Sequence, residues 1–132
     1  MAAIDKVAYI YIKDGKLLST RSKGKDKYYI PGGKREENET DIETLIREVK
    51  EELSVDIIED SARFYGIFVA QAHGKAEGVL VKMTCYTADY VGQLQADSEI
   101  AEIVWLTTDD IDNVSPVDKL IFADLDKKGL LK

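Results

Sequence analysis

Near its start the chain alternates around Val7, Tyr9 and Tyr11, which is the pattern of a strand that buries one face. Residues 6–13 place an apolar or aromatic side chain at every second position, beginning with Val7. The dipeptide Asp14-Gly15 follows, and a second strand-like run covers residues 16–22. An Asp-Gly pair between two such runs is typical of a tight turn, so this segment is predicted to be a β-hairpin.

The rest of the chain mixes strand-like and helix-like segments. Its patterns predict, in chain order, a brief strand at 28–30 that ends at Pro31-Gly32-Gly33, a helix from Thr40, strands at 62–72 and 79–90 around a polar turn, a polar loop at 92–98, a strand at 103–106, a helical turn at 108–110, and a last helix that starts at Ser115-Pro116 and ends at Gly129. This order predicts an α/β fold with a mixed β-sheet between helices.

The helix after the paired glycines has two distinct faces. At 100° per residue, its apolar side chains form one stripe, made of Ile42, Leu45, Ile46, Val49 and Leu53. Glu48, Glu51 and Glu52 share an arc along the edge of that stripe. Thr40 followed by Glu43 is a capping box that begins the helix. The three glutamates are therefore predicted to border a packed surface.

These three carboxylates occupy the last turn of the helix, where the helix dipole disfavours acids by a few tenths to about 1 kcal/mol each. Carboxylates three and four residues apart also repel one another, by roughly 0.2 to 0.5 kcal/mol per pair. A bound divalent cation offsets both costs. The spacing alone leaves open a second interpretation, an ordinary solvated acidic face.

Residues 33–55 resemble the signature of the Nudix hydrolases, which contains a glycine, an isolated Glu, an Arg-Glu pair and a Glu-Glu pair at fixed spacing. The matching residues are Gly33, Glu39, Arg47, Glu48, Val49, Glu51, Glu52 and Val55. Ser54 stands where that signature has its second glycine, which ends the helix in a left-handed conformation that costs other residues roughly 1 kcal/mol. The carboxylates themselves match without exception.

This resemblance implies an α/β/α sandwich that hydrolyses a nucleoside diphosphate linked to a further group. By the same resemblance, Glu51 and Glu52 ligate Mg²⁺, for which Mn²⁺ can substitute, and Glu48 ligates the metal or orients the attacking water. Arg47 and Glu39 hold the carboxylates in register. The carbonyl of Gly32 supplies another oxygen ligand.

The resemblance also implies residues outside the helix. A further acid is expected from a loop that faces the metal, and Glu99 is preferred over Glu102 because it lies in the polar loop. Lys34 and Arg21 are the expected phosphate contacts. For each of these residues an ordinary surface position is the alternative.

The chain is most similar to the MutT-like branch of the family, which cleaves damaged nucleoside triphosphates to monophosphate and pyrophosphate. Asn113 or Asp118, beside the start of the last helix, would then read an oxidised purine, and a helix cap or surface position is the alternative for each. The match to that branch is incomplete, because Val114 stands where its bacterial members have an asparagine. Alternative substrates are ADP-ribose, dinucleoside polyphosphates and sugar nucleotides, and a non-catalytic nucleotide-sensing module is a further alternative. Isoprenyl diphosphate isomerisation on the same scaffold requires a catalytic cysteine, and Cys85 falls in a predicted strand far from the glycines.

Composition limits the remaining possibilities. With 132 residues, the chain fits a single domain over 1–132. A net charge of −7 argues against sequence-independent binding of polymeric nucleic acid, because such binding needs a basic surface. The apolar runs are too short to span a membrane, and there is no secretory signal pattern. We therefore expect a cytoplasmic monomer or homodimer that acts on a small nucleotide.

Overall fold

The computed structural model describes residues 3–132. Its strands are β1 (Ala3–Ile10), β2 (Ile12–Lys13), β3 (Lys16–Ser22), β4 (Gly32–Lys34), β5 (Asp56–Ile57), β6 (Arg63–Gln71), β7 (Leu80–Thr87), β8 (Tyr90–Val91) and β9 (Ile100–Leu106). Its helices are α1 (Asp41–Leu53) and α2 (Pro116–Lys127), with short 3₁₀ turns η1 (Glu59–Ser61) and η2 (Thr108–Asn113). Within this range no helix is long and apolar enough to cross a membrane.

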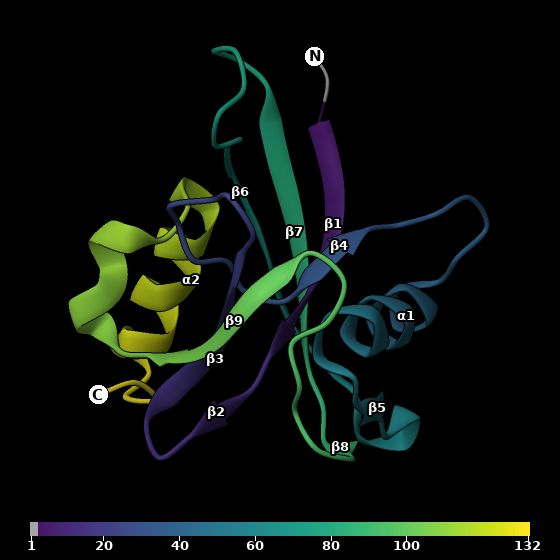
Figure 1. Ribbon diagram of the computed structural model, residues 1–132. Coiled ribbons are helices and arrows are strands. Elements are labelled where there is room, and N and C mark those ends of the chain that lie inside the picture. Colours follow the sequence, from purple (N-terminus) through teal and green to yellow (C-terminus); the bar gives the residue numbers. More distant parts are fainter. Residues whose placement is uncertain (1–2) are drawn as a thin grey trace.

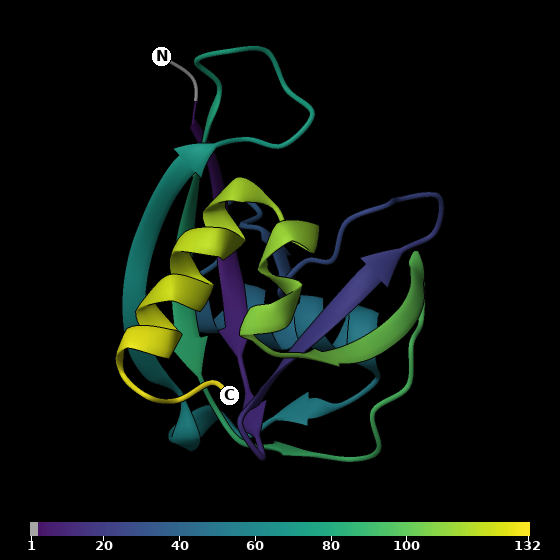
Figure 2. The same cartoon turned by 90° about the vertical axis from the view of Figure 1, so that its left-hand side faces the viewer.

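The strands form a mixed four-stranded sheet and two smaller antiparallel sheets. In the large sheet the order is β4-β1-β7-β6, and β1 runs parallel to β7 while the other pairs are antiparallel. The second sheet has the order β2-β3-β9, and β5 pairs with β8. Figure 1 shows α1 and α2 on opposite sides of these sheets, and Figure 2 shows α2 lying across the face of the large sheet.

Two hydrophobic cores follow from the alternation of side chains along β1. Val7 and Tyr9 pack with α1, whereas Ala8 and Ile10 point to the other face and pack with α2. All four side chains are almost completely buried. The chain is thus a sandwich with a mixed sheet between helices, and the predicted α/β fold is confirmed.

The predicted hairpin is also present, with Asp14 and Gly15 both at positive φ in the turn. The brief strand predicted at 28–30 is wrong, because these residues make only two isolated bridges and the strand is β4. A Cβ atom at Gly32 would overlap the carbonyl oxygen of Val7. Glycine therefore allows β4 to approach β1 closely. The pairing with β1 involves residues 32–34 and not the expected residues 28–30.

Candidate metal and nucleotide site

Local sequence signals set the position of α1. Thr40 accepts a hydrogen bond from the backbone of Glu43 at 3.1 Å, and the Glu43 carboxylate accepts one from the Thr40 backbone at 2.9 Å. This confirms the predicted capping box. The stripe residues Leu45, Val49 and Leu53 are 0% exposed, and burying each contributes about 1.5 to 3 kcal/mol. Their burial fixes which face of α1 carries the acids.

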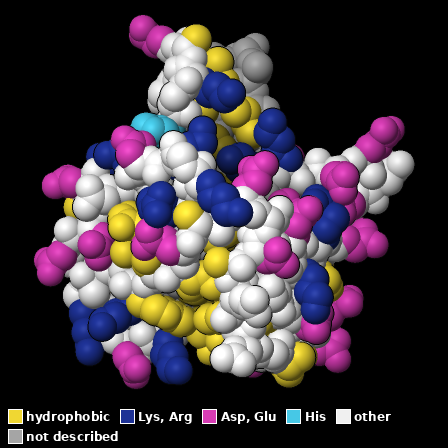
Figure 3. All heavy atoms as spheres, in the orientation of Figure 1, with side chains coloured by type: hydrophobic (Ala, Val, Ile, Leu, Met, Phe, Trp, Pro, Cys, Tyr) yellow, Lys and Arg dark blue, Asp and Glu magenta, His cyan; other side chains and the backbone are white. Residues whose placement is uncertain are grey.

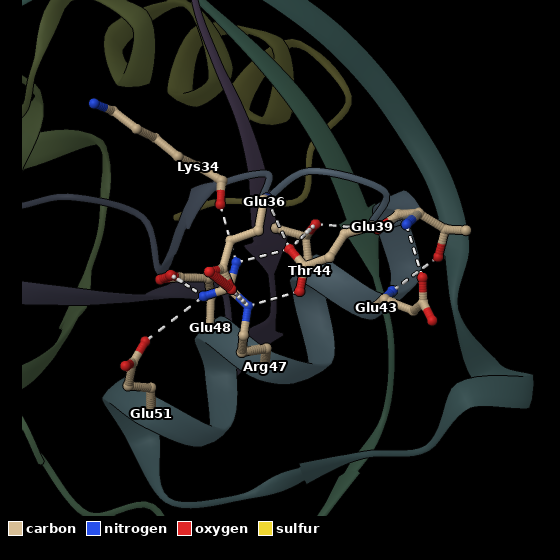
Figure 4. Close-up of polar contacts among 9 residues, drawn as sticks. Lys34, Glu36, Glu39, Glu43, Thr44, Arg47, Glu48 and Glu51 are labelled. Atoms are coloured by element: carbon tan, nitrogen blue, oxygen red, sulfur yellow. Dashed lines mark hydrogen bonds and ion pairs between the residues drawn. The ribbon is translucent and has the colours of Figure 1, made fainter.

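Arg47 ties α1 to the segment that precedes it (Figure 4). Its guanidinium donates to both carboxylate oxygens of Glu39, at 2.7 and 2.8 Å, and to the carbonyl of Lys34 at 3.0 Å. It also reaches the carboxylate of Glu48 at 3.2 Å. The hydrogen bonds from Arg47 lower the pKa of Glu39 to about 2. Glu39 therefore stays ionised and holds the guanidinium beside Glu48.

The three glutamates of the last turn have different surroundings. The side chain of Glu48 is 13% exposed and that of Glu51 is 55% exposed. Glu52 is partly buried and accepts a hydrogen bond from the backbone N–H of Gly32 at 3.2 Å. A Cβ atom at Gly33 would overlap the Glu48 carboxylate, so the two glycines lie directly against these two acids.

Burial raises the pKa of both inner glutamates. For Glu52 the pKa rises to about 8, mainly by desolvation and further by repulsion from Glu48 and Glu51, against the Gly32 hydrogen bond. Desolvation also raises the pKa of Glu48, although the neighbouring Arg47 opposes it. Two partly dehydrated carboxylates with few hydrogen bonds are a donor set that a hard cation would satisfy.

Within residues 3–132, however, no three acidic, histidine or cysteine side chains converge on one metal position. Glu48 and Glu52 lie against the glycines, whereas Glu51 is more exposed and makes only a weak contact with Arg47 at 3.9 Å (Figure 4). Glu48 and Glu52 therefore offer a cation carboxylate donors of the right type, but among the described residues a third carboxylate is not in place. Glu51 joins the inner pair only by changing its side-chain conformation.

A cavity of about 280 Å³ extends from this glycine corner. Gly32 and Glu52 line one end, and Ile30 and Ser115 line another part of its wall. Asp118 lies behind that wall, is 0% exposed, and accepts a hydrogen bond from the Ile30 backbone at 3.0 Å. The Ser115 hydroxyl and the second Asp118 oxygen are buried near each other but make no hydrogen bond of good geometry. Burial raises the pKa of Asp118 to about 7.

Cations that sequence reasoning missed also line the cavity, together with aromatic rings. Lys6, Lys25 and Lys75 contribute to its wall, and the ring of Tyr29 lies edge-on to that of His73 with centroids 6.4 Å apart. Lys6 comes from β1 and lowers the pKa of both Glu52 and Asp118. Lys6 could have been found from its even-numbered position, because it lies on the same face of β1 as the buried Ala8 and Ile10.

The predicted phosphate contacts lie outside the cavity wall. Arg21 is paired with Glu102 at 2.7 Å, which also leaves Glu102 engaged away from the glutamates of α1. Lys34 is exposed, and its side chain points away from Arg47 in Figure 4. Arg21 and Lys34 could therefore contact only a phosphate that extends beyond the cavity.

Two further predicted residues are also exposed. Asn113 offers its backbone carbonyl to Tyr28 at 2.8 Å, and Glu99 offers its carbonyl to Lys23 at 2.8 Å. Acidic side chains gather over α1 and the loop before it, on the right of Figure 3. The helix that carries the candidate metal ligands thus lies under an acidic part of this face.

Residues 4–125 match the NUDIX domain family. This chain belongs to the Nudix family. The resemblance of residues 33–55 to the signature of this family is thereby confirmed. The family typically depends on a divalent metal and takes small nucleotide-type substrates.

Named relatives agree with this membership. The chain is 27% identical over 101 residues to an uncharacterized Nudix hydrolase, YvcI, of Bacillus subtilis, and the match spans 76% of this chain and 64% of that protein. The chain therefore corresponds to less than two thirds of that relative's length.

Solved structures share the Nudix fold along most of the chain. The ORF135 protein of E. coli is 27% identical, with a TM-score of 0.69 and coverage of 97% of this chain and 94% of that one. A MutT protein from Methanosarcina mazei has a TM-score of 0.77 at 19% identity, covering 97% and 96% of the two chains. At that lower identity the likeness concerns the fold alone.

Proposed function

We propose that this chain uses Mg²⁺ to hydrolyse nucleoside triphosphates to nucleoside monophosphate and pyrophosphate. The observation that carries the proposal is the placement of Glu52. It is a partly buried carboxylate with a raised pKa, it lies on the glycine corner, and it opens into a cavity with cationic side chains. A buried acid of this kind, inside a cleft, is typical of a functional site.

In this proposal Glu48, Glu51 and Glu52 hold the metal with the carbonyl of Gly32, and Glu99 completes the set. Bound Mg²⁺ neutralises charge on the phosphates and acidifies a water molecule. Arg47 supports the site indirectly, because its pairing with Glu39 keeps the Glu48 carboxylate in place.

The nucleoside would occupy the rest of the cavity. Tyr29 offers a ring face for the base, and Lys6 and Lys25 lie where a polyphosphate would pass toward Glu52. Ser115 and Asp118 carry buried polar atoms that make no hydrogen bond of good geometry, and the edge of a purine base would supply better partners if Ile30 moved aside. Their presence supports a preference for an oxidised purine over other nucleotides.

The test is a Mg²⁺-dependent assay on a panel of nucleoside triphosphates, 8-oxo-dGTP, ADP-ribose, dinucleoside polyphosphates and sugar nucleotides, with pyrophosphate release as the readout. We expect hydrolysis of triphosphates that EDTA abolishes, and a higher rate on 8-oxo-dGTP than on dGTP. Equal rates on these two would remove the oxidised-purine preference. Turnover of ADP-ribose or sugar nucleotides alone would overturn the triphosphate assignment.

The metal assignment is tested by Glu52→Gln, with Glu37→Gln as the matched control because Glu37 is an exposed glutamate in the loop before α1. We expect Glu52→Gln to lose at least 100-fold in kcat while its circular dichroism spectrum is unchanged, and Glu37→Gln to retain activity. Full turnover by Glu52→Gln would show that the metal is bound elsewhere.

A further inference from the structure

The loop over residues 92–99, which joins β8 to β9, is fastened to the last turn of α1. The backbone N–H of Gln95 donates to the carbonyl of Leu53 at 2.9 Å, and that of Asp97 donates to the carbonyl of Glu52 at 3.2 Å. These carbonyls belong to the end of the helix, where no intrahelical donor is available. The loop thus caps the helix that carries the candidate metal ligands.

Ser54 adds a side-chain contact to this cap. It ends α1 in the left-handed conformation, with φ of 65°, which is unfavourable for a residue with a Cβ atom. Its hydroxyl donates to the carbonyl of Gln95 at 3.1 Å. Glycine would adopt this conformation without strain but has no hydroxyl. In serine the hydrogen bond to the loop offsets the unfavourable backbone conformation.

The fastened loop leads directly to Glu99. Asp97, which caps Glu52, lies two residues before Glu99, and the carbonyl of Glu99 accepts a hydrogen bond from Lys23 at 2.8 Å. The loop is therefore held by α1 on one side and by the end of β3 on the other. A shift of the loop relative to α1 would move Glu99 relative to Glu52.

We propose that Ser54 is a positioning residue, whose hydroxyl holds loop 92–99 against α1 and so places Glu99 beside the metal ligands. This inference rests on the proposed function, because it assigns Glu99 to the metal site. Ser54 acts through the loop and touches neither the substrate nor the metal.

Three variants separate the hydroxyl from the backbone strain. Ser54→Gly removes both, Ser54→Ala removes only the hydroxyl, and Ser54→Thr keeps the hydroxyl but adds a β-branch to a strained position. We expect Ser54→Gly and Ser54→Ala to lose about three- to tenfold in kcat, the loss that corresponds to one hydrogen bond, with an unchanged KM for the nucleotide. We expect Ser54→Thr to retain most of the kcat.

Stability should follow a different order. Ser54→Gly should unfold at the same or a higher temperature than the unchanged protein, whereas Ser54→Ala and Ser54→Thr should unfold at lower temperatures. A purely structural role predicts instead that kcat follows stability, with Ser54→Gly fully active. That result would overturn the proposal.

Two measurements keep failure of the inference distinct from failure of the proposed function. Hydrogen exchange of the Gln95 and Asp97 amides should be faster in Ser54→Gly, whether or not a substrate is known, and unchanged exchange would overturn the clamp. Mn²⁺ binding, followed by electron paramagnetic resonance, should weaken in Ser54→Gly and in Glu99→Gln, and no more in the double variant than in Glu99→Gln. Unaltered Mn²⁺ binding in Glu99→Gln would remove Glu99 from the site and overturn the positioning role.

Discussion

The buried carboxyl of Asp118 should make the stability of the folded protein fall as pH rises. Its side chain is 0% exposed, it accepts one hydrogen bond from the backbone of Ile30, and its other oxygen lies near the Ser115 hydroxyl without a hydrogen bond of good geometry. Burial raises its pKa from 3.8 to about 7, so the folded state holds the proton more tightly than the unfolded chain does. Replacing it with asparagine removes the ionisation while keeping the shape and an acceptor for Ile30.

The sign and size of the effect follow from this pKa. Between pH 4 and pH 7 the folded protein binds more protons at Asp118 than the unfolded chain, so its contribution to stability decreases as pH rises through this window. A pKa difference of about three units corresponds to about 4 kcal/mol when the group is fully ionised. Between pH 5 and pH 8 the change is about 2.5 kcal/mol.

The assay is chemical denaturation of the unchanged protein and of Asp118→Asn at pH 5 and pH 8. The free energy of unfolding of Asp118→Asn relative to the unchanged protein should rise by about 2.5 kcal/mol between these two pH values. Asp126→Asn, an exposed aspartate on the same helix, is the matched control and should show little change. A difference for Asp118→Asn that does not depend on pH would refute the reasoning, because it would mean that Asp118 ionises equally easily in the folded and unfolded states.

Two other predictions concern the cavity and its glycine corner. Gly33→Ala places a methyl group on the Glu48 carboxylate and should displace it. Mg²⁺-dependent hydrolysis, measured by pyrophosphate release, should then fall at least tenfold, while the unfolding temperature changes by only a few degrees. Retention of full activity would contradict the role of Glu48. Lys6→Met should raise the KM for a nucleoside triphosphate about tenfold, which is the effect of losing one charged hydrogen bond. Lys34→Met should change this KM less than twofold. The reverse order in steady-state kinetics would assign the phosphate contact to Lys34.

The elements that the sequence predicted well are those governed by local rules. The helix α1 follows from its apolar period and from the reciprocal hydrogen bonds of Thr40 and Glu43, which involve residues three apart. The hairpin after β1 follows from Asp14-Gly15, because this turn depends only on its own two residues. Such signals need no knowledge of distant parts of the chain.

Features that depend on long-range packing were predicted less well. The strand β4 lies beyond the segment expected at 28–30, because its position depends on how closely the Gly32 backbone can approach β1. The sequence does not identify Lys6 as a cavity residue, because the alternation around Val7 indicates burial of the odd-numbered face of β1 alone. In the folded protein both faces of β1 are covered, so the even-numbered face is also turned inward.

The three glutamates show how folding divides residues that the sequence presents as equivalent. Helical spacing places Glu48, Glu51 and Glu52 on one arc, but only the packing of the glycine turn decides which of them loses its water. Glu52 and Glu48 lie against the glycines and have raised pKa values, whereas the side chain of Glu51 is 55% exposed. Because a cation favours ionised ligands, its binding at the proposed site would release the proton that burial retains on Glu52 and would also draw Glu51 inward. In the proposed site a divalent metal would relieve the electrostatic cost of ionising the buried Glu52 carboxylate, so we expect metal affinity to depend most strongly on Glu52.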